Sequence, residues 1–134
     1  MSSDIAARCA AIEESYESML AYAGQGLLAE GGAIRECLQR AEQALSGIAE
    51  CYALAVKREE LQPAEQYAAF GAVLESDARN ALAAVELVLA QNVISSQLID
   101  NLNASIHLRS LLTDLFLVDE IFKIQRTKPV ASGS

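Results

Sequence analysis

Few residues of this chain have the type and spacing that metal or acid–base chemistry requires. Its 134 residues include one histidine, His107, and no glutamate stands three residues before it. A carboxylate-bridged di-iron bundle needs repeated Glu-x-x-His pairs that face inward, and a zinc site needs several close ligands. The three cysteines form no C-x-x-C pair. The sequence therefore predicts no metal, no cofactor and no catalytic residue.

A polar strip near the C-terminal end comes closest to an acid–base site. Asp100 and Asp114 each lie seven residues from His107, so the three side chains could share one helix face. They would be two turns apart and could not hydrogen-bond to one another directly. We therefore interpret the strip as a solvated polar face.

The three cysteines are predicted to be buried and reduced. Cys37 and Cys51 are fourteen residues apart, which is two heptads, so they share one helix face. Cys9 could be a nucleophile only beside a base, and the single histidine lies far away in the sequence. Free cysteine packs as a small apolar residue, which favours the core. A redox pair between Cys9 and Cys51 is the alternative.

Glu86 is the most unusual single residue, because it lies inside the apolar stretch ALAAVELVLA at positions 81–90. An unpaired charge is expensive to bury. The sequence favours an exposed helix edge for Glu86. The alternatives are an ion pair with Arg79 or Arg109, or a role in interface specificity.

Apolar residues recur at helical spacing in four segments. The most regular stripe runs from Ile34 to Ala55 in alternating steps of four and three residues. Pro63 suits the first turn of the third segment. Short connections between such segments predict an all-α fold, an antiparallel four-helix bundle of two helical hairpins. The predicted domain covers residues 1–125, followed by a flexible tail at 126–134. The predicted helices cover residues 3–23, 33–60, 63–91 and 96–123.

Acidic residues dominate the charge. Eighteen acids against ten bases give a formal charge of −8, and residues 1–122 hold all eighteen acids but only seven bases. Nucleic acid and anionic membranes are therefore predicted not to be partners, whereas a basic protein would be attracted. The N-terminus lacks the basic start and apolar stretch of a signal peptide, and no apolar run is long enough for a bilayer. We expect a cytoplasmic protein.

Residues after Asn80 and after Leu108 are more apolar than one bundle core requires. Such a surplus is typical of an interface, and the simplest closed arrangement is a two-fold homodimer. The sequence thus favours a non-enzymatic protein-interaction module, an adaptor or chaperone that self-associates. One alternative is an inhibitor or immunity-type protein for a basic enzyme. Another is an accessory subunit or small-ligand carrier. The candidate interface residues are Leu87, Leu111, Leu115, Phe116, Val118 and Phe122.

Overall fold

The computed structural model describes residues 2–25, 28–29 and 32–127, which fold into six helices and one minimal β-ladder. The two-residue strands β1 (Leu28–Ala29) and β2 (Ile94–Ser95) pair in antiparallel register. All other regular secondary structure in these residues is helical, which confirms the all-α class. The helices are α1 (Ser2–Gln25), α2 (Ala33–Leu45), α3 (Ile48–Arg58), α4 (Ala64–Leu89), α5 (Ser96–Ala104) and α6 (Ile106–Thr127).

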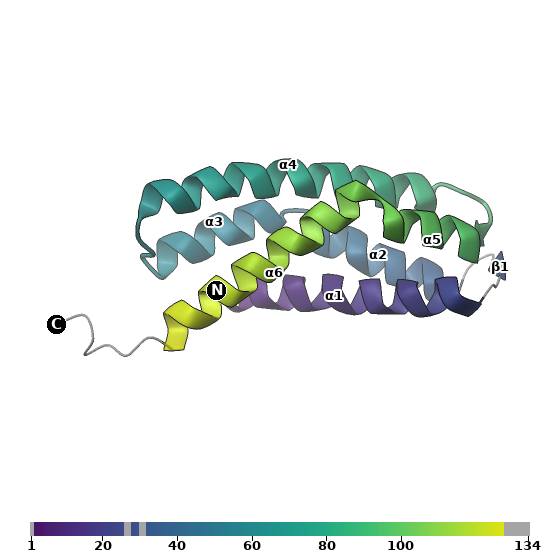
Figure 1. The fold of residues 1–134 in the computed structure, drawn as a ribbon, viewed down its shortest axis with the longest axis horizontal. Helices are drawn as coiled ribbons and strands as arrows, with labels where there is room; N and C mark the ends of the chain where they lie inside the picture. Colours follow the sequence, from purple (N-terminus) through teal and green to yellow (C-terminus); the bar gives the residue numbers. More distant parts are fainter. Residues whose placement is uncertain (1, 26–27, 30–31, 128–134) are drawn as a thin grey trace.

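The helices lie side by side along the long axis of the molecule (Figure 1). α2 and α3 together return along α1, α4 runs back beside them, and α5 and α6 return again. α6 crosses its neighbours obliquely. It packs mainly on α4, and its C-terminal half reaches α1, where Val118 and Phe122 meet Ile5 and Cys9. α6 therefore diverges from α4 toward its own C-terminal end.

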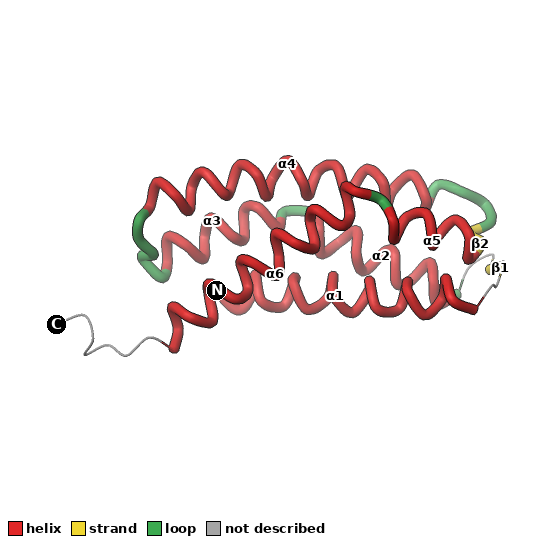
Figure 2. The backbone as a smooth tube through the Cα atoms, in the orientation of Figure 1, coloured by secondary structure: helices red, strands yellow, loops and turns green. Residues whose placement is uncertain are grey.

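The predicted number of helices is wrong, because the second and fourth predicted helices are each broken in two (Figure 2). Gly47 has a φ of 81°, in the left-handed region that favours glycine, and it separates α2 from α3. Ser105 adopts an extended conformation between α5 and α6. Its Oγ accepts a hydrogen bond from the His107 backbone N–H at 3.3 Å, so it starts the next helix.

Two arginines fasten the ends of helices to neighbouring elements. Their guanidinium groups donate to backbone carbonyls that a helix terminus leaves without intrahelical partners. Arg8 of α1 bonds the carbonyls of Gln43, Ala44 and Ser46 at the end of α2. Arg35 of α2 bonds those of Leu89, Gln91 and Asn92 at the end of α4. Each arginine therefore ties a turn to a helix distant in sequence.

The core follows the predicted apolar stripes. The Ile34–Ala55 stripe is buried throughout, even though the helix breaks between Leu45 and Ile48. The break keeps the helical phase, so the same face stays inward on both sides. The buried members of this stripe are Ile34, Leu38, Ala41, Leu45, Ile48, Tyr52 and Ala55.

Candidate functional site

The structure divides the six candidate interface residues into two groups. Leu87 is 67% exposed and Phe116 is 55% exposed, so both remain available to a partner. The other four are in the core, which corrects their assignment to a surface. They lie on the inward face of α6 together with Leu108 and Leu112, so one helical stripe contains them all. The four corrected residues are Leu111, Leu115, Val118 and Phe122.

The first three turns of α4 carry an apolar surface that sequence reasoning did not identify. None of residues 64–73 is buried, although eight of these ten are alanine, glycine, valine or aromatic. The sequence predicts an apolar excess after Asn80, but Ala81, Val85 and Val88 of that stretch are buried. In the sequence, this surface is indicated by the run YAAFGAV at 67–73, which is apolar on every helix face.

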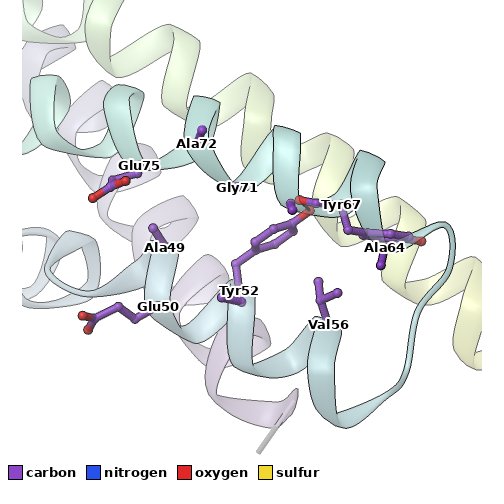
Figure 3. Close-up of a pocket in the computed structure, with 11 residues that line it drawn as sticks. Ala49, Glu50, Tyr52, Val56, Ala64, Tyr67, Gly71, Ala72 and Glu75 are labelled. Carbon is purple, nitrogen blue, oxygen red and sulfur yellow. Dashed lines mark hydrogen bonds between the residues drawn. The ribbon is translucent and has the colours of Figure 1, made fainter.

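A groove runs between α3 and this part of α4 (Figure 3). Its volume is about 470 Å³. The Tyr52 ring extends from α3 across the groove toward α4, where a Cβ placed on Gly71 would lie 3.3 Å from Tyr52 Cε2. Glu50 and Glu75 lie at one end of the groove. The lining is otherwise apolar: Ala49, Tyr52, Ala53, Val56, Ala64, Tyr67, Ala68, Gly71 and Ala72.

A second hollow, which we call the wedge, lies on the other side of α4, where α6 diverges from it. Its volume is about 190 Å³. Tyr52 again contributes, and its ring centroid lies 6.5 Å from that of Phe70 and 6.1 Å from that of Phe122. These contacts fix an aromatic lining. The wedge is lined by Tyr52, Gln66, Tyr67, Phe70, Leu117, Val118, Ile121 and Phe122.

Exposed apolar side chains adjoin the wedge. On α4, Phe70 is half-buried and Val73 is 45% exposed. On α6, Leu117 is 49% exposed and Ile121 is half-buried. We call these four residues the wedge face. Each pair is three or four residues apart on its helix, so the four side chains flank one seam.

Tyr52 has no acid–base role in either hollow. Its hydroxyl donates a hydrogen bond to the Tyr67 carbonyl at 2.8 Å. Burial, and then the neighbouring Tyr67 phenol, raise the pKa of Tyr52 to about 12. The phenol therefore stays neutral at physiological pH and serves as a rigid packing element.

Three pairs of carboxyl groups meet across helix seams: Glu13 with Asp119, Glu42 with Glu86, and Asp77 with Asp114. Burial, followed by the neighbouring carboxyl group, raises the pKa of Asp114 to about 7. The same two causes raise the pKa of Glu42, and they raise that of Glu13 against an opposing contribution from Lys123.

Glu86 is exposed, as the sequence analysis favoured, and its neighbour is Glu42 rather than an arginine. The proposed strip of Asp100, His107 and Asp114 does not face one way. Asp100 and His107 are exposed, whereas Asp114 turns toward Asp77 of α4. The strip is therefore not an assembled site.

All three cysteines are free, and two of them are buried as predicted. Burial, with smaller contributions from Asp119 and Glu13, raises the pKa of Cys9 to about 12. Burial also raises the pKa of Cys37, whose Sγ donates to the Ser15 carbonyl at 3.2 Å. The prediction of burial is wrong for Cys51, which is only half-buried. The buried thiols are therefore poor nucleophiles.

Within residues 2–25, 28–29 and 32–127, no group of three or more histidine, cysteine or acidic side chains could hold a metal ion. None of the described helices combines the length and the apolar character that crossing a bilayer requires. Comparisons with protein-family models, with curated proteins and with solved structures found no match to this chain.

Proposed function

We propose that this chain is a non-enzymatic protein-interaction module, of the adaptor or chaperone kind, that self-associates through the wedge face. The observation that carries the proposal is the aromatic-lined wedge, whose lining includes half-exposed Leu117, together with half-exposed Val73 one helical turn from the wedge residue Phe70. Helix-in-groove recognition needs an apolar hollow and an apolar stripe beside it. Both stand on the same seam between α4 and α6.

A second copy of the chain is the occupant that this surface suits best. A two-fold interface uses the same patch from both partners, so the patch must offer both projecting side chains and a hollow to receive them. Val73 and Leu117 project, and the wedge lies directly beside Leu117.

Sedimentation equilibrium tests the proposal. We expect the unmodified protein to be a dimer at tens of micromolar, and Leu117→Glu to be a folded monomer. A carboxylate placed on an apolar interface must be desolvated, which opposes association. Val73→Glu should act in the same way.

Leu54→Glu is the matched control, because Leu54 and Leu117 are both leucines with 49% exposure, and Leu54 lies on α3 outside both hollows. We expect it to remain dimeric. A monomeric unmodified protein, or equal loss of dimer in Leu54→Glu and Leu117→Glu, would contradict the proposal.

A further inference from the structure

The seam between α4 and α6 contains two carboxyl groups that face each other, those of Asp77 and Asp114. The carboxyl of Asp77 lies within hydrogen-bonding reach of that of Asp114, and both side chains are half-buried. The Oδ2 atom of Asp114 is fully buried and has no hydrogen-bond partner. Two ionised carboxylates have no proton to share, so this oxygen is satisfied only when one of the groups is protonated.

The ion pairs of the described residues leave this carboxyl pair uncompensated. Among the described residues, the ion pairs involve neither Asp77 nor Asp114. On α6 itself, His107 and Arg109 are exposed. Titratable groups on the other helices interact with different partners. Glu42 of α2 interacts with Glu86, and Glu13 of α1 interacts with Asp119. Tyr52 of α3 lies beside Tyr67, and Asp100 of α5 is exposed.

The pair stands at one end of the wedge face. Val73 precedes Asp77 by one helical turn on α4, and Leu117 follows Asp114 by three residues on α6. α4 and α6 run in opposite directions, so the wedge lies directly beyond the two carboxyl groups. The separation of the helices at this pair therefore sets how wide the wedge can be.

We propose that Asp77 and Asp114 form a proton-controlled clasp on the wedge. With one proton shared between them, the clasp holds the first half of α4 against α6. Loss of that proton to water leaves two like charges in a partly buried seam, which drives α4 away from α6 and widens the wedge. The inference rests on the proposed function only in treating the wedge face as the docking surface.

The raised pKa of Asp114 places this transition in the neutral range. Burial and the Asp77 charge raise the pKa of Asp114 to about 7, far above the 3.8 of an unperturbed aspartate. The opened seam exposes the carboxyl groups to water, so they bind protons more weakly there. Raising the pH across the neutral range therefore favours the open seam.

Hydrogen exchange at the backbone amides of residues 68–77 measures the opening. After division by the intrinsic exchange rates, we expect opening of the unmodified protein to rise about tenfold between about pH 6 and about pH 8. Asp114→Asn should abolish this change, since its amide donates to the Asp77 carboxylate at any pH. Asp100→Asn removes an exposed aspartate and should behave like the unmodified protein.

A second measurement follows the carboxyl groups themselves. The chain has five aspartates, so carboxyl ¹³C resonances of selectively labelled protein can be followed individually. We expect one resonance to titrate near neutral pH and to be absent from Asp114→Asn. The clasp is overturned if every aspartate titrates below about pH 5, or if Asp114→Asn keeps the full pH dependence of exchange. Both measurements report on the seam within one chain, so their results do not depend on whether the protein forms a dimer.

Discussion

Tyr52 links the two hollows at the level of single residues. Its ring lies under the first half of α4, with Gly71 above it, Phe70 and Phe122 beside it, and its hydroxyl on the Tyr67 carbonyl. These contacts restrict the movement of the ring. The shape of both hollows therefore depends on the absence of a side chain at position 71.

Replacement of Gly71 by alanine tests this dependence. Glycine inside a helix usually costs about 1 kcal/mol relative to alanine, so Gly→Ala normally stabilises. At Gly71 the added Cβ would press on the fixed Tyr52 ring at 3.3 Å. We expect Gly71→Ala to lower the free energy of unfolding by about 1 kcal/mol in urea denaturation, because overpacking outweighs the helix preference.

Gly24→Ala provides the comparison, because nothing lies within 4 Å of a Cβ at Gly24 in α1. That variant should be more stable than the unmodified protein by about 0.5 kcal/mol. A similar stabilisation by Gly71→Ala would show that Tyr52 yields, and that the hollows are less rigid than the contacts indicate.

The ends of helices depend on long-range capping. Arg8 crosses from α1 to three carbonyls at the break between α2 and α3, so it stabilises a turn that local sequence leaves weak. A cation at a helix C-terminus also interacts favourably with the helix dipole. This contact fixes where α2 ends relative to α1.

Arg8→Met should destabilise the protein by about 1–2 kcal/mol, since hydrogen bonds from a charged donor to three carbonyls are lost. Arg40→Met removes the same charge from an exposed position on α2, and we expect a change within about 0.5 kcal/mol. Thermal and urea unfolding measure both. Equal destabilisation by the two variants would attribute the effect to net charge rather than to the cap.

Helix positions and the core were predictable from the sequence, whereas the breaks and the exposed face were not. The 4-3-4-3 stepping from Ile34 to Ala55 predicts the buried face correctly, because periodicity records which side faces inward. The same stepping continues across Gly47, so it contains no sign of the break. Ser105 similarly lies inside the predicted helix at 96–123 and yet separates two helices.

The candidate site was missed because exposure depends on how helices cross. The run at 67–73 and the stretch at 81–90 are both apolar, and only the oblique course of α6 leaves the first uncovered. For the same reason Leu115 and Phe122 are buried, whereas Leu117 is half-exposed. No single-sequence pattern specifies a crossing angle, which arises from ridge-and-groove packing of side chains on both helices.

At the scale of the whole molecule, acids accumulate where helices meet. Carboxyl pairs occur at the α1–α6, α2–α4 and α4–α6 seams, and eighteen acids face ten bases in the chain. A few acidic side chains are neutralised by ion pairs, such as that of Glu59 with Arg126 at 3.1 Å. The excess of like charge opposes the compact state. Stability should therefore respond to both pH and salt.

The sign of the pH response follows from the raised pKa values. A carboxyl group whose pKa is higher in the folded state binds its proton more tightly there, so folding is favoured at acidic pH. Unfolded glutamate and aspartate, with ordinary pKa values of 4.5 and 3.8, lose their protons first as the pH rises. The stabilisation then declines until the folded groups also ionise, which for Asp114 is at about pH 7.

We therefore expect the free energy of unfolding in urea to be greater at about pH 5.5 than at about pH 8. Adding sodium chloride should stabilise the protein more at the higher pH, because screening relieves repulsion only where the carboxyl groups are ionised. Asp114→Asn should reduce this pH dependence, because the folded-state pKa of Asp114, about 7, lies between the two pH values. Greater stability at about pH 8, or a salt effect that does not differ between the two pH values, would show that the paired carboxyl groups do not oppose folding.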